Sequence, residues 1–124
     1  MLVLYAEDDI DDFDFFCDVL KSFDPAAKCL NMRNGREAIE FLDNAVVLPD
    51  IIFLDINMPA MDGKSCLKNI KRDARLNAIP VVIYTTSQSQ RDREHCMQLG
   101  AKDFIIKAKS FGEAESNLSR FFKG

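Results

Sequence analysis

Hydrophobic residues along the chain form short continuous runs, separated by segments in which they recur every three or four positions. The continuous runs predict buried β-strands, because a strand covered on both faces is apolar throughout. The runs are Leu2–Ala6, Ile51–Leu54, Val81–Tyr84 and Phe104–Ile106, and the less apolar segment Lys28–Met32 is a weaker strand candidate. Each run is followed by a segment with helical spacing, so strands and helices are expected to alternate.

The helical segments each place apolar residues on one face. The residues expected to point inward are Ile10, Phe13, Cys17 and Leu20; Ala38, Ile39 and Leu42; Cys66, Leu67 and Ile70; and Phe111, Ala114, Leu118 and Phe121. The segment from Ser87 to Leu99 is mostly polar, with apolar cover only from Cys96, Met97 and Leu99. We therefore expect this helix to be the least firmly packed.

Five alternating strands and helices predict an α/β fold with parallel strands and right-handed crossovers. The simplest architecture is flavodoxin-like, a doubly wound (βα)5 fold with strand order 2-1-3-4-5. The 124 residues suffice for one domain, which we expect to span residues 1–124. In such a sheet the ligand site lies beyond the carboxyl ends of the strands, where strands 1 and 3 diverge.

Polar residues follow four of the predicted strands. Glu7–Asp9 follows the first strand, Asp55 the third, Thr85–Ser87 the fourth and Lys107 the fifth. Clustered carboxylates repel one another and need a compensating cation, and oxygen ligands suit Mg²⁺ better than zinc. A hard cation beside a carboxylate, a hydroxyl and a lysine can support phosphoryl transfer.

Each of these residues also has a plainer explanation when it is taken alone. Asp9 fits the N-cap of the helix that starts at Ile10, and Asp11, Asp12 and Asp14 fit a solvated helix face. A lone Asp or Thr at a strand end is commonly a turn residue. An EF-hand beginning at Asp9 is excluded, because Asp14 stands where the loop needs glycine. The functional interpretation therefore depends on the four strand ends sharing one edge of the sheet.

Composition narrows the partners and the location. The net charge of −4 and pI of about 4.9 argue against nucleic-acid binding. The apolar runs are too short to span a membrane and the N-terminus lacks a signal-peptide pattern, so we expect a cytoplasmic protein. Cys17, Cys29, Cys66 and Cys96 are scattered and are expected to act as small buried hydrophobes. The single His95 beside Cys96 is only a weak zinc signal.

The residues at the strand ends also match a family. The sequence resembles the receiver domains of two-component response regulators, in particular stand-alone receivers like the chemotaxis regulator, over residues 2 to about 122. The matching motifs are YAEDD (5–9), LDINMP (54–59) with MDG (61–63), PVVIYTT (80–86), and GA (100–101) with FIIK (104–107). They occur in the family's order and spacing.

The resemblance implies a phosphoacceptor signalling switch. Asp55 would accept a phosphoryl group from a histidine kinase or a histidine phosphotransfer protein. Asp8 and Asp55 would bind Mg²⁺ directly with the backbone carbonyl of Asn57, and Glu7 would support the metal. The only chemistry implied is Mg²⁺-dependent self-phosphorylation and dephosphorylation, so we do not expect an enzyme with a separate substrate.

The resemblance also implies a response to phosphorylation. Lys107 would pair with the phosphoryl oxygens, Thr85 would hydrogen-bond one of them, and Phe104 would be the aromatic switch residue. Only two residues follow Phe122, so the output is expected to pass to a partner protein. The docking surface would be the polar helix, strand 5 and the last helix.

Some residues depart from the family pattern. Ala108 replaces the usual proline after Lys107, so we expect no cis peptide there. Phe104 lacks the hydroxyl of the commoner tyrosine, and Thr86 stands where smaller residues are frequent. Asn57 and Ser87 occupy positions that tune hydrolysis in the family, and neither is a strong acid or base. Slow hydrolysis of the acyl phosphate is therefore expected.

Two other functions stay open at this stage. A flavodoxin-like FMN protein would need a phosphate-binding loop after strand 1, where Glu7–Asp9 would repel phosphate in the absence of a metal. An inactive receiver-like interaction module would use the fold without the chemistry. The acidic residues and the lysine of the active family are all present, which favours the phosphoacceptor.

Overall fold

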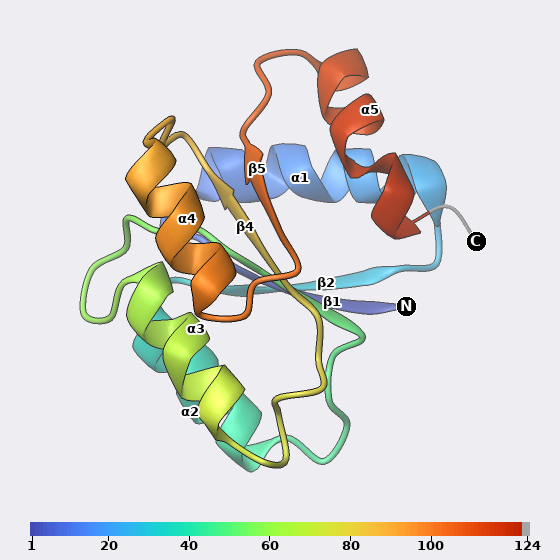
Figure 1. Cartoon of the computed structure of the whole chain (residues 1–124). Coiled ribbons are helices and arrows are strands. Elements are labelled where there is room, and N and C mark those ends of the chain that lie inside the picture. Colours follow the sequence, from blue (N-terminus) through green and yellow to red (C-terminus); the bar gives the residue numbers. More distant parts are fainter. Residues whose placement is uncertain (123–124) are drawn as a thin grey trace.

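Strands and helices alternate along the whole computed structural model, which describes residues 1–122 (Figure 1). The strands are β1 (Leu2–Ala6), β2 (Lys28–Met32), β3 (Ile51–Leu54), β4 (Val81–Thr85) and β5 (Asp103–Ile106). The helices are α1 (Ile10–Phe23), α2 (Gly35–Asn44), α3 (Gly63–Arg72), α4 (Gln90–Gln98) and α5 (Phe111–Phe122). Residues 123 and 124 of the expected domain lie outside the described range.

The strands form one parallel sheet in the order β2-β1-β3-β4-β5, which confirms the predicted flavodoxin-like topology. The chain leaves β1 toward one edge and returns to β3 on its other side, so the strand order reverses between β1 and β3. Tyr5 pairs with Asn31 on one side and with Phe53 on the other. The predicted ligand site therefore lies beyond the ends of β1 and β3.

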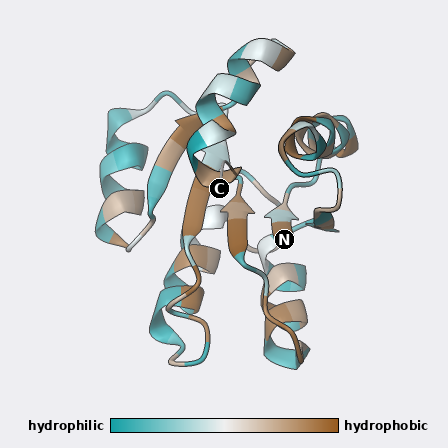
Figure 2. Ribbon diagram, turned by 90° about the vertical axis from the view of Figure 1, so that its right-hand side faces the viewer, coloured by the Kyte–Doolittle hydropathy of each residue, from teal (hydrophilic) through white to brown (hydrophobic). Residues whose placement is uncertain are grey.

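Helices cover both faces of the sheet. Helices α1 and α5 lie on one face, while α2, α3 and α4 lie on the other (Figure 1). Successive residues of a strand point to opposite faces, so Leu4 packs in one core and Tyr5 in the other. The strands are the most hydrophobic part of the chain, and the helices carry hydrophilic residues on their outer sides (Figure 2).

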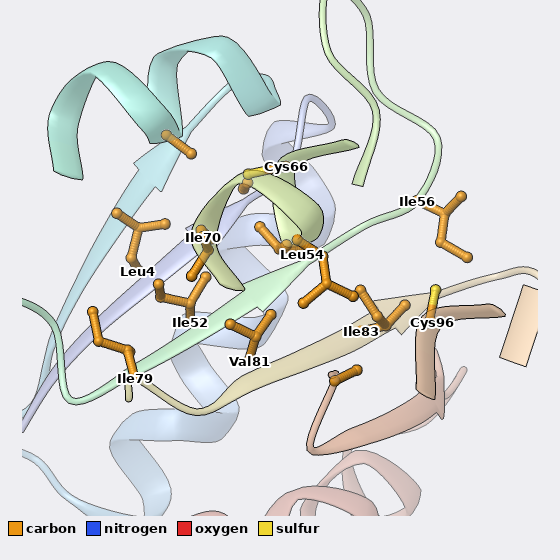
Figure 3. Packing of buried hydrophobic residues seen from close by; sticks show 14 of the residues in the cluster. Leu4, Ile52, Leu54, Ile56, Cys66, Ile70, Ile79, Val81, Ile83 and Cys96 are labelled. Carbon is orange, nitrogen blue, oxygen red and sulfur yellow. The ribbon is translucent and has the colours of Figure 1, made fainter. Parts of the chain in front are cut away.

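The core beneath α2, α3 and α4 is aliphatic, and the core beneath α1 and α5 is aromatic. In the first core, Cys66 and Ile70 of α3 lie over Ile52 and Leu54 of β3 (Figure 3). The second core is built around the rings of four residues, Tyr5, Phe16, Phe53 and Tyr84, with centroids 4.6–6.4 Å apart. Aromatic pairs at this spacing contribute about 0.5–1.5 kcal/mol each beyond the area they bury.

The predicted inward faces of α1 and α5 were each wrong at their first residue. Ile10 is 59% exposed, and Phe111 is also exposed. The buried faces are Phe16, Val19 and Leu20 in α1, and Ala114, Leu118 and Phe122 in α5. Both exposed residues begin their helix, in the turn that lies beyond the edge of the sheet. An apolar residue in that turn matches the helical spacing without having a sheet surface to cover.

The cysteines divide into two kinds. Cys66 and Cys96 are fully buried, as predicted, and Cys96 is the one buried residue of the weakly covered α4. The same prediction was wrong for Cys17 and Cys29, which are half-buried. Cys17 lies on the side of α1 that faces the sheet edge, and Cys29 lies on the edge strand β2, where no further strand covers it.

Two further expectations concern the backbone and the membrane. The peptide bond between Lys107 and Ala108 is trans, as are all peptide bonds among the residues described. Across residues 1–122 we find no helix whose length and apolar character would let it cross a bilayer.

Candidate functional site

Three strands deliver charged side chains to one point beyond the carboxyl edge of the sheet. The ammonium group of Lys107, after β5, donates hydrogen bonds to Glu7 after β1 and to Asp55 after β3. Its distance to the Asp55 carboxylate is 2.9 Å. A third hydrogen bond of 2.8 Å reaches Asp12 in α1. The lysine side chain is only 11% exposed, so these ion pairs are shielded from water.

The strand register explains why these residues meet. Ala6 pairs with Leu54, so Glu7 and Asp55 occupy equivalent positions one residue beyond each strand. The Asp55 N–H donates to the carbonyl of Ala6 at 3.1 Å and holds that register to the end. The Lys107 N–H likewise donates to the carbonyl of Thr85 at 2.7 Å. The predicted convergence of strand ends is therefore a direct result of parallel pairing.

Glu7 is buried and fully engaged by protein donors. Its Oε1 accepts from Lys107 and from the Tyr5 hydroxyl at 3.2 Å, while its Oε2 accepts from the Asp9 N–H at 3.2 Å. Burial raises the pKa of Glu7 to about 7, with a further upward contribution from the Asp55 charge; the hydrogen bond from Lys107 acts in the opposite direction. Glu7 is thus a buried carboxylate whose charge depends on its lysine.

Lys107 remains an ammonium in spite of its partial burial. Burial lowers the pKa of this lysine, but hydrogen bonds to Asp12, Glu7 and Asp55 outweigh it and raise the pKa above its usual range. A permanent cation beside Asp55 can neutralise negative charge that arrives at that carboxylate.

Asp55 lies at the centre of the site and is buried. Its Oδ1 accepts a hydrogen bond of 3.2 Å from the Asn57 N–H, and its Oδ2 faces Lys107. Gly63, the first residue of α3, lies directly against the backbone here. A Cβ atom at Gly63 would stand 2.2 Å from the Asp55 carbonyl oxygen. Glycine is therefore required for α3 to begin this close to Asp55.

Asp8 lies on the open side of the same edge. Asp8 and Asn57 are exposed, and together with Asp62, Lys64 and Asp92 they line a groove of about 540 Å³. Among residues 1–122, no hydrogen-bond donor is found for the Asp8 carboxylate, and no three His, Cys, Asp or Glu side chains are placed to hold a metal together. The ligands that the sequence predicts, the carboxylates of Asp8 and Asp55 and the backbone carbonyl of Asn57, are all oxygens, which suit a hard cation that keeps several waters.

The two predicted switch residues are both buried. Thr85 is inaccessible to solvent, and its Oγ1 accepts a hydrogen bond of 3.3 Å from the Ser87 N–H. The ring of Phe104 packs beneath α4, where the Arg93 guanidinium stands 5.3 Å from the ring centroid. Arg93 also donates to the Phe104 carbonyl at 3.1 Å. The Phe104 position is thus coupled to α4 through one arginine.

The predicted N-cap role of Asp9 is confirmed, since its side chain accepts from the Asp11 and Asp12 N–H groups. Asp12, expected on a solvated helix face, has a side chain that is 43% exposed, and it also accepts a hydrogen bond from Lys107. The helical position of Asp12 one turn after the N-cap directs it back over the sheet edge. The three-residue spacing between Asp9 and Asp12 was the feature of the sequence from which this position could have been predicted.

A second polar network beside the site was not anticipated. Asp92 in α4 accepts from Lys64 of α3 at 2.7 Å and from the Ser87 hydroxyl at 2.6 Å. These hydrogen bonds hold the pKa of Asp92 below its usual range, with Lys64 the larger cause. The network joins the start of α3 to the loop after β4. No local pattern in the sequence pairs residues so far apart.

Comparison with known proteins agrees with this geometry. The family model described as "Response regulator receiver domain" matches residues 3–118. Response regulator Rcp1 of Synechocystis is 30% identical over 98% of this chain and 82% of its own length. The probable methanogenesis regulatory protein FilR2 of Methanothrix harundinacea is 37% identical over 70% of this chain, but the match spans only 59% of FilR2.

Solved structures extend the agreement to the fold. The phosphorylated cyanobacterial phytochrome response regulator RcpA superposes with a TM-score of 0.89 at 28% identity, over 98% of this chain and 92% of RcpA. The Mn²⁺-bound form of Rcp1 gives 0.88 at 28% identity, over 98% and 94% of the two chains. Receiver domains bind a divalent metal and take phosphoryl groups from kinases or phosphotransfer proteins. Because the family match covers nearly all of its length, the chain belongs to the response regulator receiver domain family.

Proposed function

We propose that this chain is a phosphoacceptor switch in which the Asp55 carboxylate takes a phosphoryl group from the phosphohistidine of a histidine kinase or phosphotransfer protein. The single observation that supports this most is the Lys107 ammonium, which lies between Glu7 and Asp55 at one point of the sheet edge. Membership of the receiver family supports the same reaction class.

For this reaction the protein mainly has to position the attacking carboxylate and neutralise negative charge. An Asp55 oxygen attacks phosphorus, the phosphorus–nitrogen bond to the donor imidazole breaks, and the imidazole leaves as the phosphoryl group becomes an acyl phosphate. A carboxylate needs no base for this attack. Lys107 offsets the negative charge that collects around Asp55. The protein is therefore a substrate that assists its own phosphorylation, rather than an enzyme acting on a separate molecule.

The metal we propose is Mg²⁺, with ligands from Asp8, Asp55 and the Asn57 carbonyl. The open groove along Asp8 and Asn57 supports this choice, because Mg²⁺ needs room for its remaining waters. When bound, the cation would neutralise carboxylate and phosphoryl oxygens. We assign Glu7 a supporting role, since its two oxygens are already bonded to Lys107, Tyr5 and Asp9.

The proposed signal passes from Asp55 to the surface formed by α4, β5 and α5. Thr85 would turn its hydroxyl to a phosphoryl oxygen, which requires release of the hydrogen bond from Ser87. Phe104 would follow into the vacated space. A groove of about 350 Å³ lined by Arg93, Phe104 and Arg120 supports this surface as the docking site for a downstream protein.

Labelling with acetyl phosphate tests the proposal. The wild-type protein should gain one acid-labile phosphoryl group, only when Mg²⁺ is present. Asp55→Asn should abolish labelling, and the exposed Asp11→Asn should leave it unchanged as a matched control. Labelling at another residue, or in the absence of any divalent ion, would contradict the site. No labelling at all, in a protein that also fails to bind Mg²⁺, would identify an inactive receiver-like module.

Amide exchange tests the switch. Phosphorylation should change exchange within residues 85–110, and an unchanged pattern there would contradict the proposed path.

We further propose that residues 1–124 act as one domain. The proposed location is the cytoplasm, the compartment in which four free cysteines stay reduced.

A further inference from the structure

Two cysteines from different elements meet at the uncovered edge of the sheet. Cys17 lies in the middle of α1, and Cys29 is the second residue of the edge strand β2. Their thiol groups lie close enough for each to influence the ionisation of the other. Both side chains are half-buried and line a groove of about 760 Å³, with Lys21 and Lys28 at its border.

The pair lies away from the proposed phosphorylation site. Cys29 pairs with Val3 near the start of β1, whereas Glu7 and Asp55 follow the opposite ends of β1 and β3. A small reagent that enters the groove can therefore reach these thiols without passing the strand-end carboxylates. The pair has no role in the proposed phosphoryl chemistry.

The two thiols differ in their surroundings. The neighbouring Cys29 thiol lowers the pKa of Cys17, and the Lys21 charge acts in the same direction, against burial and the charges of Asp14 and Asp18. The neighbouring Cys17 thiol, together with burial, raises the pKa of Cys29. Thiolate is the reactive form of cysteine, so Cys17 is the nucleophile of the pair and Cys29 is its neighbouring thiol.

The other two cysteines provide an internal contrast. Cys66 and Cys96 are fully buried under α3 and α4. Burial raises the pKa of Cys66 to about 12 and that of Cys96 to about 11. Neither lines the groove that exposes Cys17. Among the four cysteines of the folded protein, oxidation should therefore begin at Cys17.

We propose that Cys17 and Cys29 form a reversible disulfide when a peroxide oxidises the protein. The Cys17 thiolate attacks one oxygen of hydrogen peroxide, the O–O bond breaks, and hydroxide leaves to give a sulfenic acid. The Cys29 sulfur then attacks the Cys17 sulfur, the S–O bond breaks, and a second hydroxide leaves. The protons of the two thiols convert the hydroxides to water. Two thiols are thus oxidised by two electrons, and one peroxide is reduced to two waters.

The disulfide would fasten α1 to the edge strand. Residues 17 and 29 flank the turn between α1 and β2, so the bond closes a short loop and restricts the unfolded chain. The oxidised protein should therefore unfold at a higher denaturant concentration than the reduced protein. Dithiothreitol should reverse the change, because the groove leaves this half-buried disulfide accessible to thiolate attack.

Intact-mass analysis with thiol counting tests the proposal on the folded full chain. After treatment with hydrogen peroxide, the wild-type monomer should lose two hydrogen atoms of mass and two of its four free thiols. Digestion should give one linked fragment holding Cys17 and Cys29. Cys29→Ser should instead accumulate a Cys17 sulfenic acid that dimedone traps, and Cys17→Ser should react slowly.

Three results would overturn the proposal. They are disulfides only between chains, first reaction of a thiol at Cys66 or Cys96, and a wild-type protein in which Cys17 gains oxygen while Cys29 stays a free thiol. Circular dichroism of both serine variants before oxidation checks that each is folded, so that a missing disulfide is not a result of unfolding. Acetyl phosphate labelling of the same samples is independent of the disulfide and reads the proposed function separately.

Discussion

Replacing Lys107 with methionine removes the cation that bonds two buried carboxylates. Glu7 and Asp55 are both buried, and Lys107 donates to each of them. Breaking a buried ion pair by deleting one partner costs about 3–5 kcal/mol, because the remaining charge is left uncompensated. The contact with Asp12, whose side chain is 43% exposed, adds at most about 1 kcal/mol.

Protonation of Glu7 limits the loss. Its pKa is about 7 even with Lys107 present, so the variant can neutralise this group at modest cost near neutral pH. We therefore expect a loss of about 3 kcal/mol in the free energy of unfolding at pH 8, from the lower end of the range for a broken buried pair. In a chain of this length, that loss lowers Tm by roughly 10 °C.

The stability lost on substitution of Lys107 should depend on pH. A folded-state pKa above the unfolded value of 4.5 stabilises the fold at low pH, and this stabilisation is lost as pH rises through the folded pKa. The wild-type protein completes the loss near pH 7, whereas the variant, with a still higher pKa, continues to lose stability above it. The difference between the two proteins should therefore be smaller at pH 5.5 than at pH 8.

Urea unfolding in metal-free buffer at both pH values measures this difference. Lys109→Met is the matched control. Lys109 lies two residues away and is exposed, and its substitution removes the same charge. The control should differ from the wild type by less than about 0.5 kcal/mol. Equal losses for the two variants, or a Lys107→Met loss that does not change between pH 5.5 and pH 8, would refute the proposed electrostatics.

Further substitutions test the packing and the second network. Gly63→Ala should destabilise the fold by about 1–3 kcal/mol in urea unfolding, because its Cβ overlaps the Asp55 carbonyl; a neutral result would contradict the close approach. Gly112→Ala in α5 meets nothing within 4 Å and should stabilise by about 0.5–1 kcal/mol, with a destabilised protein as the contrary outcome. Asp92→Asn should cost about 1 kcal/mol at pH 7, since this partly exposed carboxylate pairs with Lys64. The lowered pKa of Asp92 means that this cost is present above pH 3.8 and disappears in more acidic buffer; a constant cost across an acid titration would refute the pairing.

The sequence predicted the parts of the fold that depend on one-dimensional periodicity. Continuous apolar runs identified four of the five strands, and the weaker candidate Lys28–Met32 also forms a strand. Parallel topology then placed Glu7, Asp55 and Lys107 at one edge. This inference was possible because backbone pairing alone brings the residues that follow neighbouring parallel strands to the same edge of the sheet, independently of their side chains. Register and chain order were sufficient, and no contact between side chains had to be known.

The same reasoning could not predict contacts between side chains that are far apart in the sequence. Cys17 and Cys29 belong to different elements, and only the edge position of β2 brings the two thiols together in the open. Lys64 and Asp92 are 28 residues apart and meet because α3 and α4 are adjacent on one face of the sheet. The prediction failed at the start of α1 for a related reason. Ile10 has the spacing of an inward-facing residue, but it lies beyond the part of the sheet that the helix covers.

The geometry of Lys107 also determines what the arrival of a phosphoryl group must cost. An ammonium group has three hydrogens, and Glu7, Asp12 and Asp55 accept all three. A phosphoryl oxygen on Asp55 can therefore bind Lys107 only if one of these three contacts is released, and the contact to Asp55 itself is the first that the phosphoryl group can replace. If a second phosphoryl oxygen also binds Lys107, Asp12 is the partner that yields, because it is half-exposed and water replaces its lost hydrogen bond, whereas Glu7 would be left buried. On the proposed function, a phosphoryl group held by two hydrogen bonds from Lys107 would thus loosen the contact between the start of α1 and the end of β5.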